Sequence, residues 1–64
     1  MKRRKLLRHL AGNSCEVEGE GKRHTRVINT LTGRKSFVPR HPEIKPNLVR
    51  AICWQLGIPE PQEK

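Results

Sequence analysis

The chain has 64 residues, which is enough for one small domain with a thin hydrophobic core. Only 33% of the residues are hydrophobic and 3% are aromatic, which excludes the deep, enclosed cleft that many metabolic enzymes need. Fourteen Lys and Arg against six acidic residues give a formal net charge of +8, which indicates a polyanionic partner such as nucleic acid.

The first predicted element is an amphipathic helix over about Arg3 to Ala11. Apolar side chains recur there at helical spacing, and Gly12-Asn13 follows, a pair suited to ending a helix. Cations are dense in the same segment. Arg4 and Lys5 are candidates for contact with RNA phosphates, and a solvated helix face is the alternative.

Three short strands are predicted next, joined as an antiparallel meander. Cys15 and Val17 alternate with glutamates, which is typical of a half-buried strand with an acidic outer face. After a glycine-containing turn, the β-branched residues of Thr25 to Asn29 favour a second strand. Thr32-Gly33 offers a hairpin turn to a third strand over Lys35 to Val38, which a proline ends.

The second strand does not alternate perfectly. Val27 falls on the face opposite His24, whereas Ile28 shares the side of His24. We therefore expect either a bulge or a sheet that is covered on both faces at this point.

The last predicted element is a helix that begins at Pro46, because proline at the first helical position gives up no hydrogen bond. Its apolar stripe comprises Leu48, Val49, Ile52 and Leu56. Gly57 followed by Pro59 ends the helix. The order is α-β-β-β-α, an α+β fold with a three-stranded antiparallel sheet and two helices on one face. Residues 1–58 form the single domain, and residues 59–64 are expected to be a flexible tail.

The spacing of the residues that could bind a metal does not indicate a metal or cofactor site. These are His9, Cys15, His24, His41 and Cys53. None stand at the intervals that metal sites use, so we expect no metal and no cofactor, and we interpret both cysteines as small buried apolar side chains. The longest apolar runs are two to three residues, so we expect no membrane span and a cytoplasmic protein.

One cluster suits catalysis. His24 begins a strand just after a glycine-bearing turn, and its neighbours in sequence are Lys22, Arg23 and Arg26. RNA can be cleaved without a metal when a base takes the 2′-hydroxyl proton and cations hold the charge on the phosphate. The alternative is a passive nucleic-acid-binding face. His41, which precedes a proline in a loop, is either a second acid–base group or a structural residue, and Lys35 is a further candidate for phosphate contact.

Several segments together resemble the HicA (YcfA-like) family of toxin mRNA interferases, over residues 2 to 58. The segments are Gly21-Lys22-Arg23-His24, Thr32-Gly33-Arg34-Lys35-Ser36, Val38-Pro39-Arg40-His41-Pro42-Glu43-Ile44, and Ile52-Cys53 with Leu56-Gly57-Ile58, after the basic first helix and Cys15-Glu16. The resemblance implies a fold like that of double-stranded-RNA-binding domains. It also implies a ribonuclease toxin that a HicB-type antitoxin holds inactive.

The same resemblance implies a role for one histidine. The family's essential histidine ends a Gly-Ser-His motif at the start of the second strand, and position for position it is His24. Here Lys22 and Arg23 replace the small pair, so a catalytically inactive RNA-binding domain of the same fold is the alternative function.

The second helix offers a further surface. Trp54 points away from the apolar stripe, near Arg50 and Asn47, and exposed tryptophans are enriched at the centres of protein interfaces. Contact of Trp54 and Arg50 with the antitoxin is one interpretation, and self-association or an incidental exposed tryptophan are the alternatives. A DNA-binding role for this helix is a third hypothesis, although only Asn47, Arg50 and Gln55 could read bases.

Overall fold

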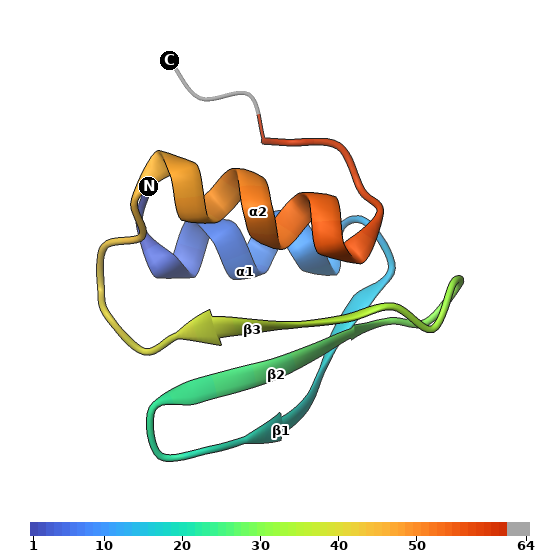
Figure 1. Ribbon diagram of the computed structural model, residues 1–64, viewed down its shortest axis with the longest axis horizontal. Helices are drawn as coiled ribbons and strands as arrows, with labels where there is room; N and C mark the ends of the chain where they lie inside the picture. Colours follow the sequence, from blue (N-terminus) through green and yellow to red (C-terminus); the bar gives the residue numbers. More distant parts are fainter. Residues whose placement is uncertain (62–64) are drawn as a thin grey trace.

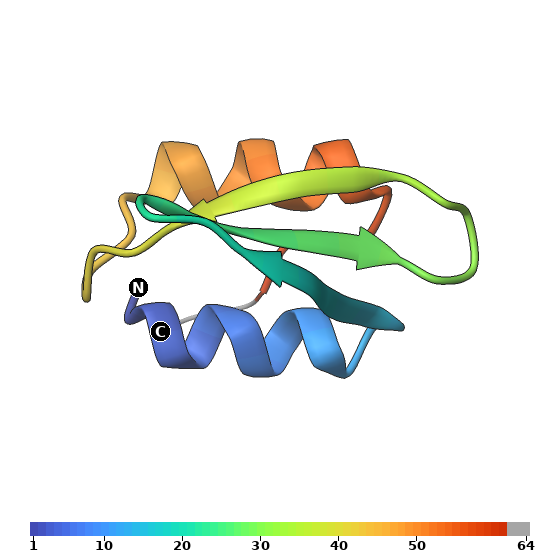
Figure 2. The ribbon, with the colours of Figure 1, turned by 90° about the horizontal axis from the view of Figure 1, so that it is seen from below.

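The computed structural model describes residues 1–61 and confirms the predicted order of elements. They are α1 (Arg3–Ala11), β1 (Cys15–Glu20), β2 (His24–Asn29), β3 (Lys35–Pro39) and α2 (Pro46–Leu56). The strands form one antiparallel sheet in the order β1-β2-β3. Both helices cover the same face of this sheet, and the other face is open (Figure 1). Seen from below, α1 lies on the β1 side and α2 on the β3 side (Figure 2).

The core lies between the sheet and the two helices. Its fully or nearly fully buried apolar members are Leu6, Leu10, Cys15, Val27, Val38, Ile44, Val49, Ile52, Cys53 and Leu56. Side chains of β2 alternate between the two faces of the sheet, and those of Thr25, Val27 and Asn29 point toward the helices and are buried. His24 and Arg26 consequently lie on the open face.

The ends of α2 follow the sequence prediction. Pro46 occupies its first turn, and Gly57 ends it in the left-handed conformation at φ 72°. The N–H of Ile58 donates to the carbonyl of Cys53 at 3.0 Å, and the buried Asn29 Nδ2 donates to the carbonyl of Leu56 at 2.8 Å. These bonds satisfy carbonyls that a helix end otherwise leaves unpaired.

The expected burial of Val17 was wrong. β1 is an edge strand that runs away from the helices (Figure 1), and the Val17 side chain is 53% exposed. A bulge between Val17 and Gly19 shifts the register, so that Glu20 lies opposite Thr25. The irregularity expected in the second strand is therefore in β1, while the pairing of β2 with β3 is regular and Ile28 is half-buried on the open face.

Leu48 also departs from the prediction, because it is 40% exposed. The stripe of α2 that faces the sheet is Val49, Ile52, Cys53 and Leu56. Cys53 belongs to this stripe, whereas Leu48 lies in a groove beside Pro39. The expectation that both cysteines are buried and unpaired is confirmed.

The segment after α2 packs against the helices. The ring of His9 donates from Nε2 to the carbonyl of Pro59 at 2.7 Å, and Arg50 pairs with Glu60. Of the tail expected at 59–64, residues 62–64 lie outside the described residues. Within residues 1–61, neither helix has the length and apolar character needed to cross a membrane.

Candidate active site

His24 lies at the start of β2 with its side chain in solvent. Its carbonyl accepts a hydrogen bond from the N–H of Gly21 at 2.8 Å, which closes the turn between β1 and β2. In the sheet, His24 pairs with Pro39 of β3. Its ring and the ring of Phe37 form a T-shaped pair, with 6.2 Å between their centroids. The imidazole is therefore held on the open face of the sheet, in contact with solvent.

The chain brings His24 and His41 to one depression, although 17 positions separate them in sequence. The depression has a volume of about 470 Å³ and is lined by Lys22, Arg23, His24, Pro39, Arg40 and His41. Two segments form it: the turn before β2 and the loop after β3. The N–H of Arg40 donates to the carbonyl of Arg23 at 3.2 Å, which holds the two segments together.

Arg40 also lines the depression, although its own position in the sequence does not indicate a functional role. Its Nη1 donates to the carbonyl of Gly21 at 3.2 Å, and its Nη2 lies 3.5 Å from Glu20 Oε2. Half of its side chain remains exposed to the depression. Its only signal in the sequence is its place between Pro39 and His41 in the block that resembles the family.

A polar network supports the turn from the helix side. The buried hydroxyl of Thr25 accepts a hydrogen bond from Arg3 Nη2 and donates to Glu20 Oε1 at 2.7 Å. Arg3 Nε also donates to the carbonyl of Pro39 at 3.1 Å. The Thr25 hydrogen bond, helped by the charges of Arg40 and Arg3, lowers the pKa of the Glu20 carboxyl below its ordinary value.

The other predicted cations are more scattered. Arg26 lies on the open face with its guanidinium over Gly19, so close that a Cβ there would fall 2.7 Å from Nη2. Lys35 pairs with Ile28 in the sheet register, roughly 13 Å along the strands from His24, and its Nζ lies 3.3 Å from Glu18. Arg4 and Lys5 belong to α1, on the other side of the sheet. Only Lys22 and Arg23 among the predicted cations line the depression with His24.

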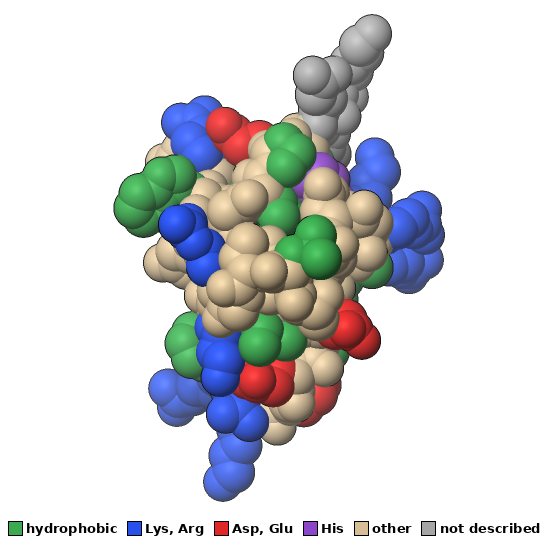
Figure 3. Space-filling model, turned by 90° about the vertical axis from the view of Figure 1, so that its right-hand side faces the viewer, with side chains coloured by type: hydrophobic (Ala, Val, Ile, Leu, Met, Phe, Trp, Pro, Cys, Tyr) green, Lys and Arg blue, Asp and Glu red, His purple; other side chains and the backbone are tan. Residues whose placement is uncertain are grey.

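The surface at the β2–β3 hairpin differs from the surface around the depression. Figure 3 faces the β2–β3 hairpin end and shows basic, acidic and apolar side chains interspersed.

Within residues 1–61, no three His, Cys or Glu side chains gather closely enough to hold a metal ion. The depression itself is lined by two imidazoles and three cations.

Comparison with known proteins identifies the family of the chain. The family model described as the HicA toxin of bacterial toxin-antitoxin matches residues 3–58. The chain belongs to the HicA toxin family. No curated protein and no solved structure matches it.

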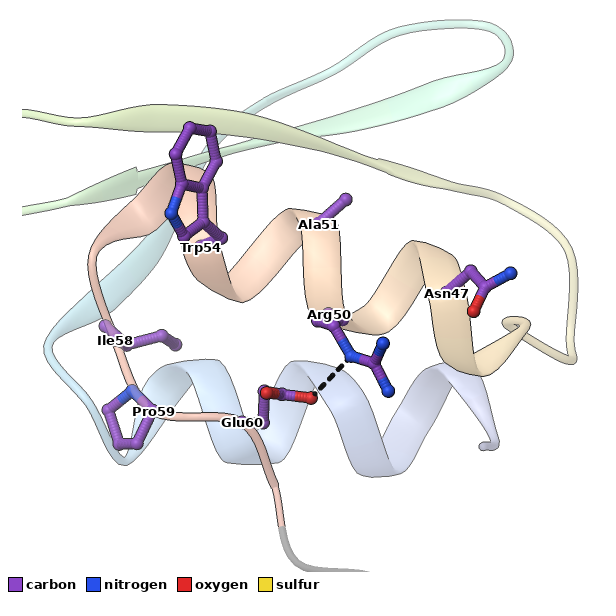
Figure 4. Close-up of a pocket in the computed structure, with 7 residues that line it drawn as sticks. All are labelled: Asn47, Arg50, Ala51, Trp54, Ile58, Pro59 and Glu60. Carbon is purple, nitrogen blue, oxygen red and sulfur yellow. Dashed lines mark hydrogen bonds and ion pairs between the residues drawn. The ribbon is translucent and has the colours of Figure 1, made fainter.

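As a HicA toxin, the chain has an antitoxin as its expected partner, and α2 carries exposed apolar surface. Trp54 is 77% exposed and lines a depression of about 560 Å³ (Figure 4). The other residues that line it are Asn47, Arg50, Ala51, Ile58, Pro59 and Glu60. Arg50 Nε is 3.1 Å from Glu60 Oε1, drawn as the dashed line in Figure 4, so the charge of Arg50 is already balanced within the chain.

Proposed function

We propose that this HicA toxin is a metal-independent endoribonuclease that cleaves mRNA, with His24 as its catalytic histidine. The observation that carries the proposal is the shared depression in which His24 and His41 face the cations of Lys22, Arg23 and Arg40. An open, shallow depression suits a polymer that passes over the surface better than a small enclosed substrate.

The reaction is a transesterification at phosphorus. His24 takes the proton of the ribose 2′-hydroxyl, and the oxygen attacks the adjacent phosphorus. The bond to the 5′-oxygen breaks, and that oxygen takes a proton from the second acid–base group, for which His41 is the candidate. The products are a 2′,3′-cyclic phosphate and a free 5′-hydroxyl.

The cations stabilise the charge that develops on the phosphate oxygens. Lys22 and Arg23 replace the small residues of the family motif, and they add two positive charges where this charge arises. One positioned acid–base group contributes roughly 10²–10⁴-fold in rate, and charge stabilisation contributes on the order of 10²–10³-fold.

The antitoxin is proposed to be of the HicB type and to cover this region. Ala51 lines both the depression at Trp54 and a groove that reaches His24. The two surfaces are thus adjacent across one turn of α2. A single partner anchored at Trp54 would extend over His24 and block the substrate.

The test is His24→Ala, with His9→Ala as the matched control, because His9 lies on α1 and binds Pro59 rather than the depression. We expect His24→Ala to abolish growth arrest on induction and to lower cleavage of purified mRNA at least 10²-fold. RNA affinity and the His9→Ala variant should stay near wild type.

Equal toxicity of His24→Ala and wild type would reject the catalytic role of His24. If the wild-type protein binds RNA without cleaving it, the inactive RNA-binding domain is the correct function. His41→Ala should remove one limb of the pH–rate profile, whereas a purely structural His41 would change stability and leave the profile's shape intact.

A further inference from the structure

A second depression meets the basic one at His24. It runs around the free edge of β3 and has a volume of about 290 Å³. Its lining residues are His24, Phe37, Pro39, Leu48, Ala51, Ile52 and Gln55. His24 and Pro39 belong to both depressions, so a cationic surface and a largely apolar one adjoin at the histidine.

A nucleotide has the same division into parts. Its phosphate needs cations, and its base needs an aromatic platform with a few polar contacts. We propose that the groove beside His24 is a base subsite, in which one base of single-stranded RNA stacks on Phe37 while the adjoining phosphate lies at His24. The proposal rests on the function proposed above and adds the part of the substrate that the groove recognises.

Phe37 has the position and exposure that stacking requires. Its side chain is 56% exposed on the open face, although phenylalanine is usually buried. Its ring lies at 76° to the ring of His24, so the two rings of the protein do not stack face to face on each other. Since bases in a duplex are already stacked on each other, this platform selects single-stranded RNA.

Gln55 supplies a polar contact at the other side of the groove. The nearly buried Ser36 hydroxyl donates to Gln55 Oε1 at 2.6 Å, which fixes the amide. Besides Oε1, the amide carries the Nε2 group, which has two N–H donors. It can bind an acceptor on the edge of a base, such as a carbonyl oxygen or a ring nitrogen.

The size and charge of the groove favour a base over a protein side chain from the antitoxin. Its volume lies at the lower end of the range of small-ligand sites and is about half of the 560 Å³ at Trp54. The basic depression adjoins it at His24 and Pro39 and attracts the phosphate next to the base.

The experiment measures binding of a 2′-O-methyl oligoribonucleotide, which lacks the attacking hydroxyl and cannot be cleaved. We expect Phe37→Ala to weaken binding about 5- to 150-fold, the usual range for one stacked base. Phe37→Trp should bind at least as tightly as wild type. Phe37→Leu, which keeps apolar bulk without a π-face, should resemble Phe37→Ala.

The matched control is Val17→Ala, since Val17 is 53% exposed but lies on β1 at the opposite edge of the sheet. Its affinity should equal that of wild type. Thermal unfolding of each variant establishes that it is folded. An oligonucleotide series with one abasic position at a time then locates the base, because the abasic penalty at that position should vanish in Phe37→Ala.

The outcomes separate this proposal from the function on which it rests. Wild-type affinity in Phe37→Ala or Phe37→Leu overturns the base subsite, even when His24→Ala abolishes cleavage. Weaker antitoxin binding with unchanged RNA binding in Phe37→Ala also overturns it and assigns the groove to the antitoxin. Retained cleavage in His24→Ala, with the predicted Phe37 effects, overturns the catalytic role and leaves the subsite standing.

Discussion

Cys15 and Cys53 are both buried thiols, but their sulfur atoms have different surroundings. Cys15 Sγ lies 3.6 Å from the carbonyl of Asn13, as a weak donor, whereas Cys53 packs among the apolar side chains of α2 and the sheet. Burial raises the pKa of both thiols, and for Cys53 the charge of Glu60 adds to the effect. Both are therefore expected to behave as structural side chains rather than as nucleophiles.

The comparison of two serine variants tests this difference. Cys53→Ser buries a hydroxyl without an established acceptor and should lower the free energy of unfolding by about 1–3 kcal/mol. Cys15→Ser should cost less, because its hydroxyl can donate to the Asn13 carbonyl. Urea unfolding measures both, with Cys53→Ala to separate lost packing from lost solvation. Equal losses in the two serine variants would contradict the assignment of partners.

The turn between β1 and β2 depends on the hydrogen bonds that join Arg3, Thr25 and Glu20. Because the pKa of Glu20 is lowered on folding, its contribution to stability is present above the ordinary value of 4.5 and is lost as the pH falls through the lower, folded value. We expect thermal stability to fall on acidification below about 4.5 and to fall less steeply in Glu20→Gln.

Glu16→Gln is the control, since Glu16 is an exposed glutamate on the same strand. Its acid profile should follow that of wild type. Glu43, whose pKa is lowered by the hydrogen bond from the amine of Met1, is intact in both variants and cannot cause a difference between them. Identical acid profiles for Glu20→Gln and wild type would show that the network does not stabilise the turn.

The elements differ in how far the sequence determines them. The predictions of a helix over about Arg3 to Ala11 and of a second helix that begins at Pro46 and ends before Gly57 agree with α1 and α2, because helical periodicity, Pro46 and Gly57 act locally. The bulge in β1 was not predicted, because its position depends on which residues of β1 and β2 pair. That bulge turns Glu20 toward Thr25 and Arg40, so part of the support of the site was not visible from the sequence.

Because the hydrophobic core is thin, the candidate site lies on the surface of the molecule. His24 could be found from its neighbours in sequence, because Lys22 and Arg23 adjoin it. Arg40 lines the same depression, and Phe37 lines the adjoining groove, because β3 pairs with β2, and this pairing is not evident from local sequence patterns. The position of Trp54 relative to His24 is likewise a tertiary property, since Ala51 lines both the depression at Trp54 and the groove that reaches His24.

This arrangement predicts separate effects on the two partners. Trp54→Ala should weaken binding of a HicB-type antitoxin about 30-fold or more, because a tryptophan at an interface centre commonly contributes at least about 2 kcal/mol. Cleavage of mRNA by the isolated toxin should not change. Leu31→Ala is the control, since Leu31 is 80% exposed but lies at the β2–β3 hairpin, and both of its activities should match wild type. Calorimetry with the antitoxin and a cleavage assay without it give the two readouts. Loss of cleavage with intact antitoxin binding in Trp54→Ala would instead place the indole against the RNA.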